Sequence, residues 1–225
     1  MKIINFKGFT LAEMLIVMAI IGIMAMLAIP TVIKTSRDRA YADMLNKVYN
    51  KIESALILNK ILNIDVSSYE IYAISNDMDS EELSKLFKEK LKVIRDCGYS
   101  EIGCFGDTNL TGYKIRLVSG EGILTNNDFR GNFDPVDFKN GILGATYIDI
   151  DGPSGTNKAG IDQFGFYTTY KGLIPMGGPQ DNIVPFSKCL SEGGFACSAW
   201  VLINKNMDYN NCPKVLNWEN KKSCN

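Results

Sequence analysis

The 225-residue chain contains no histidine. This absence excludes Ser-His-Asp triads, Cys-His dyads, HExxH zinc sites and proton transfer by imidazole. The chain also lacks a glycine-rich phosphate-binding loop, and no two cysteines have CxxC spacing. Its 24 Lys and Arg are balanced by 25 Asp and Glu, so no net positive charge is available to attract nucleic acid. We therefore expect neither an enzyme nor a nucleic-acid-binding protein.

Six cysteines form an even set, and all of them follow the apolar N-terminal segment: Cys97, Cys104, Cys189, Cys197, Cys212 and Cys224. This distribution is typical of a protein in an oxidising compartment. A zinc site is the alternative, but disulfides are favoured because no histidine completes a tetrahedral site. Of the fifteen possible pairings we expect the nearest-neighbour one, 97 with 104, 189 with 197 and 212 with 224, because it closes only local loops.

Residues 7–30 read KGFTLAEMLIVMAIIGIMAMLAIP, and Glu13 is the one charge between Phe9 and Ile29. A helix over these 21 residues is roughly 30 Å long, enough to cross a bilayer. The run is too long for a secretory signal peptide, and no small-x-small cleavage site precedes Pro30. Lysines and arginines flank both ends, so they do not decide the orientation. The cysteines indicate that the chain beyond Pro30 lies outside the cytosol.

This stretch resembles the class III signal of type IV pilins and of the pseudopilins of type II secretion. In that family a short basic leader ends in glycine, a phenylalanine follows, and a glutamate is the fifth residue after the cut. Gly8, Phe9 and Glu13 occupy these positions. The resemblance covers about the first 30 residues, and several independent requirements are met at fixed spacing.

The resemblance implies a structural subunit of a pilin-like filament, either a pseudopilin of a type II secretion system or a type IV pilin. A prepilin peptidase would remove residues 1–8 and methylate Phe9. Residues 9–29 would span the bacterial inner membrane once, residues 30–62 would continue as an amphipathic helix, and residues 63–225 would form a head in the periplasm or at the cell exterior. The implied partners are other pilin or pseudopilin subunits and an inner-membrane assembly platform. The alternative is a solitary membrane-anchored binding module or adhesin.

The resemblance also gives Glu13 a role, since a carboxylate in a bilayer is costly without a partner. In a filament, the Phe9 amine of one subunit would neutralise the Glu13 carboxylate of its neighbour and so set the stagger between subunits. The alternative is a glutamate that snorkels to the interface. Gly22 and Pro30 match the family as well, and they predict either unwinding between these residues in the filament or a simple proline kink.

Beyond the apolar segment, the sequence predicts an α+β head. Apolar residues recur at three- and four-residue spacing from Tyr41 to Leu56, so one helix is expected from Phe9 to about Leu62. A second helix is expected from Glu81 to Asp96, capped by Asp79. Expected strands are Tyr113–Val118, Ile123–Thr125, Ala145–Ile150, Phe164–Tyr170 and Trp200–Ile203. This order favours an antiparallel sheet packed on the first helix, as in the pilin fold.

The head contains one candidate metal site, in the stretch YIDIDGPSGTNKAGIDQFGF at residues 147–166. Asp149 and Asp151 share one face of a strand end, and Asn157 and Asp162 return from a glycine-rich loop. Four oxygen-bearing side chains of this kind could bind Ca²⁺, with carbonyls and water completing the coordination. The alternative is turn chemistry alone, because the same residue types are the ones that tight connections need.

Overall fold

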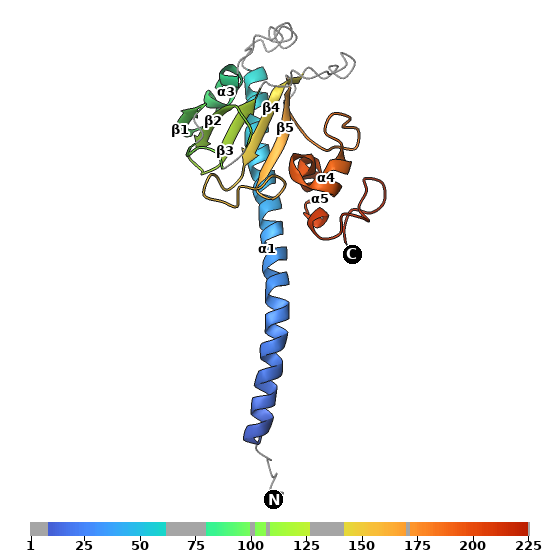
Figure 1. Ribbon diagram of the computed structural model, residues 1–225. Helices are drawn as coiled ribbons and strands as arrows, with labels where there is room; N and C mark the ends of the chain where they lie inside the picture. Colours follow the sequence, from blue (N-terminus) through green and yellow to red (C-terminus); the bar gives the residue numbers. More distant parts are fainter. Residues whose placement is uncertain are drawn as a thin grey trace, which may run out of the picture. The chain divides into compact units, whose positions relative to one another are not determined.

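The computed structural model describes residues 9–61, 80–99, 102–106, 109–126, 142–169 and 172–224. The chain forms two compact units, one up to Asp38 and the other from Arg39 onward. Helix α1 (Leu11–Ile61) runs through both units (Figure 1). The division between Asp38 and Arg39 therefore falls inside helix α1.

The second half of α1 carries the apolar stripe that its spacing predicts. Ala42, Leu45, Val48 and Ile52 are all buried in the main core of the head. The opposite face is polar, and Asp43, Lys47 and Asn50 are exposed. Burial of one stripe with solvation of the other is what a 3.6-residue period produces when a helix packs on a sheet.

Among the described residues, six antiparallel strands form the sheet, in the order in which they occur along the chain. They are β1 (Val93–Gly98), β2 (Tyr113–Leu117), β3 (Gly122–Asn126), β4 (Ile142–Asp149), β5 (Gln163–Thr169) and β6 (Gly172–Pro175). Each strand pairs with the next, so the sheet is a meander. This topology confirms the predicted α+β fold with an antiparallel head.

Both faces of the sheet are covered. Alternate residues such as Ile115, Ile148 and Phe164 join α1 in the main core. The residues between them, including Leu124 and Tyr147, pack in a second cluster with Phe105 and Met176. Helix α3 (Ser80–Lys88) adds Phe87 to the main core. The central strands are therefore buried on both sides.

The last forty residues form short helices around an aromatic cluster. These are α4 (Phe186–Glu192), η3 (Gly194–Cys197), α5 (Ser198–Asn204) and η4 (Asp208–Asn210). Phe186 stacks on Trp200 with 4.6 Å between ring centroids, and Trp218 lies 5.1 Å from both rings. The Ser198 hydroxyl accepts a 2.8 Å hydrogen bond from the backbone N–H of Gly165 in β5. The cluster is thus attached directly to the sheet.

Three disulfides close the loops of the head. They join Cys97 to Cys104, Cys189 to Cys197 and Cys212 to Cys224. These are the nearest-neighbour pairs expected from the sequence, and no described cysteine is free. Two of the three lie in the C-terminal region, where regular secondary structure is short.

Two expected elements are wrong. The expected helix from Glu81 to Asp96 ends as α3 at Lys88, and the chain then enters β1 at Val93, where Ile94 is 65% exposed rather than buried. Pairing of this segment with β2 outweighs its helical spacing. The expected strand Trp200–Ile203 is instead part of α5. An apolar run this short does not distinguish strand from helix by periodicity.

Candidate functional site

The start of α1 is built around Thr10 and Glu13. The Thr10 hydroxyl accepts a hydrogen bond from the Glu13 N–H at 3.2 Å, while the Glu13 carboxylate accepts bonds from the Thr10 N–H and hydroxyl, both at 2.8 Å. This reciprocal pattern is a capping box, which satisfies backbone donors at a helix N-terminus. The Thr-x-x-Glu spacing is the sequence signal for a capping box, although this box was not among the expected features. Glu13 therefore has a role within its own chain.

Phe9 lies beside this cap and is 81% exposed, whereas Gly8 lies outside the described residues. The helix that follows is apolar on all sides, with large hydrophobic residues exposed throughout residues 11–33. Of the helices that the structure describes, only α1 is long and apolar enough to cross a membrane by length and composition. Gly22 has open space around it, and α1 continues as a helix through Pro30.

In the head, the structure brings the expected metal-site residues to the connection that follows β4. The Asp149 side chain is fully buried, and its Oδ2 accepts a 2.8 Å hydrogen bond from the Gly106 N–H. A Cβ on Gly106 would lie 1.9 Å from Asn157 Oδ1 and 2.7 Å from Asp149 Oδ2, so these two oxygens face one point. Asn157 has a left-handed backbone (φ 55°), a conformation that asparagine tolerates better than most residues. Only glycine at position 106 leaves room for this approach.

Asp162 serves the loop rather than the cluster. Its Oδ2 accepts a hydrogen bond from the Asn157 N–H and its Oδ1 one from the Lys158 N–H, each at 2.6 Å. Both carboxylate oxygens thus hold the backbone that presents Asn157. Burial raises the pKa of Asp162, and these backbone donors act in the opposite direction.

The charges of this cluster are poorly compensated. Burial raises the pKa of Asp149 to about 7, and the negative charges of Asp151 and Asp162 act in the same direction. The hydrogen bond from the Gly106 N–H opposes this shift. One oxygen on each of three side chains, Oδ1 of Asp149, Asp151 and Asn157, is buried without a hydrogen-bond partner in the described structure. No group of three or more His, Cys, Asp or Glu side chains among the described residues has the geometry to hold a metal ion. The cluster therefore consists of two carboxylates and one amide.

Two contacts at this cluster come from distant parts of the sequence. The Tyr41 hydroxyl on α1 donates a 3.1 Å hydrogen bond to Asp151 Oδ2, across 110 residues of chain. Gly106 reaches the cluster from a position two residues beyond Cys104, whose disulfide with Cys97 closes the loop after β1. No sequence pattern signals either contact, because both depend on how α1 and the loops pack on the sheet.

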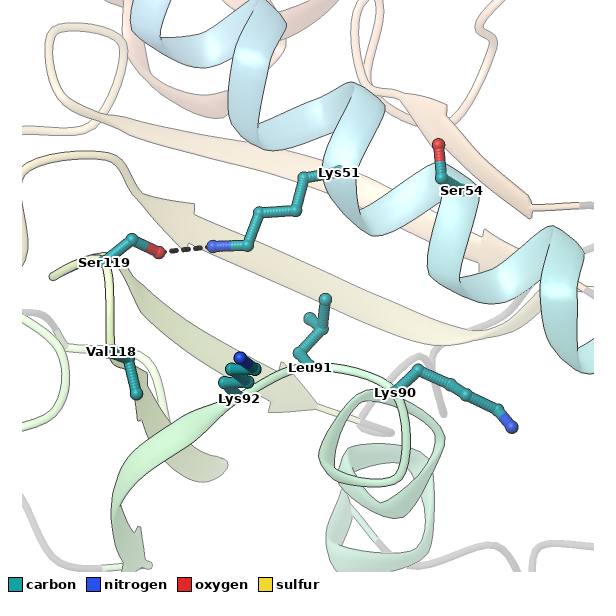
Figure 2. Close-up of a pocket in the computed structure, with 7 residues that line it drawn as sticks. All are labelled: Lys51, Ser54, Lys90, Leu91, Lys92, Val118 and Ser119. Atoms are coloured by element: carbon teal, nitrogen blue, oxygen red, sulfur yellow. Dashed lines mark hydrogen bonds between the residues drawn. The ribbon is translucent and has the colours of Figure 1, made fainter.

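The head also has an open cleft of about 580 Å³ between α1 and the start of β1, lined by Lys51, Ser54, Lys90, Leu91, Lys92, Val118 and Ser119 (Figure 2). The Lys51 amine donates to the Ser119 hydroxyl and lies 3.5 Å from a carboxylate oxygen of Glu121. In Figure 2 the Lys90 side chain points away from Lys51 and Ser119. Lys51 and Lys90 therefore do not converge on one ligand position.

Comparison with known proteins identifies the N-terminal segment. Residues 4–29 match the model of the prokaryotic N-terminal methylation motif, the class III prepilin signal of type IV pilins and pseudopilins. No curated protein and no solved structure matches the chain. The match covers the capped and exposed helix start, and together with the apolar helix it fits a membrane-anchored protein.

Proposed function

We propose that this chain is a structural subunit of a pilin-like filament, either a pseudopilin of a type II secretion system or a type IV pilin. The observation that carries the proposal is the coincidence of the methylation motif at residues 4–29 with a helix whose apolar surface is exposed along its first half. In a membrane lipid covers that surface, and in a filament neighbouring helices cover it. The protein acts by assembly, not by turnover.

Maturation proceeds at Gly8 and Phe9. A prepilin peptidase cuts between them on the cytoplasmic side, and the new Phe9 amine is methylated. Loss of Lys2 and Lys7 leaves 22 basic against 25 acidic side chains, so the formal charge changes from -1 to -3. The disulfides support a head outside the cytosol, on a single span of the inner membrane. An inner-membrane assembly platform then extracts the subunit into the filament.

Glu13 sets the register between subunits. In the isolated chain its carboxylate is held by Thr10. In the filament the methylated Phe9 amine of an adjacent subunit approaches the same carboxylate, and the two charges neutralise each other in an apolar environment. Removal of one partner of such a buried pair costs about 3 to 5 kcal/mol, equivalent to a hundred-fold or greater loss in each contact. Only a stagger that satisfies both charges is therefore tolerated.

The helix has a second assembly feature between Gly22 and Pro30. Proline lacks the N–H that would bond the carbonyl four residues earlier, and glycine lowers the cost of leaving the helical conformation. Although α1 is continuous in the isolated chain, this stretch unwinds when subunits pack side by side. Unwinding lengthens the segment without disturbing the head, which begins further along the same helix.

The capping box allows an experiment that separates the two roles of Glu13. Glu13→Gln keeps an acceptor for Thr10, because glutamine also completes a capping box, but it removes the charge. Thr10→Ala is the matched control, since it removes the cap and keeps the charge. Each variant is expressed in the native host, and its share in sheared filaments and in membranes is measured by immunoblot.

We expect Glu13→Gln to accumulate in the membrane and to be strongly depleted from filaments, while Thr10→Ala assembles. Equal incorporation of Glu13→Gln and wild type would remove the register role. If no variant, and no wild-type chain, is ever found in a polymer or crosslinks to a neighbour, the chain is a solitary anchored module and the proposal is wrong.

A further inference from the structure

Asp149, which forms a cluster with Asp151 and Asn157, is an unusual carboxylate in this head. Asp181 provides the comparison: its oxygens accept hydrogen bonds from the backbone N–H groups of Gly177, Ile183 and Val184 and from the Tyr167 hydroxyl. That pattern is typical of a carboxylate that organises a loop. Asp149 is more deeply buried than Asp181, yet only its Oδ2 receives a donor from the described residues.

Three oxygens of the cluster lack donors and have little access to solvent. They are Oδ1 of Asp149, Asp151 and Asn157. A buried polar atom without a partner carries a desolvation penalty, and the penalty is larger when the atom belongs to a charged group. Within the described ranges, no lysine or arginine forms an ion pair with Asp149 or Asp151. The cluster therefore presents only oxygen acceptors and up to two negative charges.

We propose that Asp149, Asp151 and Asn157 bind one calcium ion through these three oxygens. Calcium accepts six to eight oxygen ligands in a flexible arrangement, and backbone carbonyls and water complete such sites. Magnesium requires near-ideal octahedral geometry and loses its water reluctantly, which fits an irregular loop less well. The charge of the ion balances the two carboxylates, so both can be ionised at neutral pH.

The surrounding residues connect this site to the rest of the head. Asp162 fixes the backbone that presents Asn157, and the Gly106 N–H orients Asp149. Tyr41 ties Asp151 to the first turns of the head portion of α1. A bound ion thus fastens three segments that are distant in sequence. This inference stands independently of filament assembly, because all of its residues lie in the unit that begins at Arg39.

The test uses the full-length protein in detergent, stripped with EGTA and then dialysed against calcium or magnesium. Elemental analysis is expected to find one calcium per chain. At calcium concentrations one hundred times the dissociation constant, we expect the melting temperature to rise by about 5 to 10 °C over the stripped protein. Absence of bound calcium together with an unchanged melting temperature, or a shift with magnesium alone, would overturn the proposal.

Substitution of Asn157 by aspartate is expected to affect stability differently in calcium and in EGTA. Asn157→Asp is compatible with the left-handed backbone and adds a third carboxylate. With calcium we expect this variant to bind at least as tightly as wild type, whereas in EGTA it should melt below wild type because of charge repulsion. If Asp149 and Asp151 instead share a proton and bind no ion, Asn157→Asp destabilises equally in both buffers.

Two further variants complete the test. Asp151→Asn should weaken calcium binding more than ten-fold and abolish most of the melting shift. Asp181→Asn is the matched control, because it should lower the melting temperature by the same amount in calcium and in EGTA. A calcium-dependent shift that survives in Asp151→Asn would contradict the assignment of ligands.

Discussion

Substitution of Ile52 tests whether the second half of α1 is an integral part of the head. Ile52 is fully buried in the main core, whereas Ile33, on the same helix, is 61% exposed. Deletion of three buried carbons from an isoleucine typically costs 2 to 5 kcal/mol, because transfer free energy is lost and a cavity remains. For Ile52→Ala we take about 3 kcal/mol, equivalent to a fall of roughly 6 to 12 °C in the melting temperature for a protein of this size.

The assay is thermal unfolding of the full chain in detergent, followed by tryptophan fluorescence. The two tryptophans of the chain, Trp200 and Trp218, both lie in the C-terminal aromatic cluster, so the signal reports on the head alone. Ile33→Ala is the matched control, because it removes the same atoms from a position outside the core, and it should leave the melting temperature within about 2 °C of wild type. Equal shifts for the two variants would refute the view that α1 completes the core of the head.

The remaining predictions concern pH and redox state. Burial raises the pKa of Glu53, whose carboxylate accepts a hydrogen bond from the Leu173 N–H. Since the pKa of Glu53 is higher in the folded than in the unfolded chain, the group favours folding at low pH, and this contribution is lost as pH rises through the folded pKa. The stability of Glu53→Gln relative to wild type, measured by denaturant titration, should therefore increase from pH 4 to pH 8. A difference that stays constant over this range would contradict the prediction. Replacement of Cys212 and Cys224 by serine should lower the free energy of unfolding by about 3 kcal/mol, which is the loop-closure estimate for their separation of 12 residues. Urea titration measures this free energy, and an unchanged midpoint would contradict a structural role for the disulfide. A thiol assay on unreduced, denatured protein should detect no free cysteine, and several reactive thiols would contradict the disulfide assignment.

The sequence predicted the long helix and the central strands of the sheet. The stripe through Leu45, Val48 and Ile52 specifies both the helix and its buried face, and short β-like runs bounded by Gly, Asn and Asp predict strands β2 to β5. The edge strands β1 and β6 were missed. Their short segments become strands because a neighbouring strand pairs with them, which is a tertiary effect. Trp200 was expected in a strand and lies in α5, because so short an apolar run does not distinguish strand from helix by periodicity.

The sequence likewise predicted some features of the candidate sites, whereas others depend on tertiary packing. Spacing alone brought Asp149, Asp151 and Asn157 into one hypothesis, because a strand end and its following turn keep neighbours close. The different role of Asp162 and the contact from Tyr41 needed the structure, since both depend on which backbone groups lie nearby. At the helix start, the capping box of Thr10 and Glu13 was readable from the sequence, but the pilin resemblance accounted for the glutamate without it.

The central claim depends on an amine that exists only if the leader is removed. Mass spectrometry of the N-terminal peptide, on protein purified from membranes of the native host, tests it most directly. We expect a chain that begins at Phe9 with one added methyl group on its amine. A mature chain that still begins at Met1 would leave Glu13 without its partner, and the proposed register between subunits would be wrong.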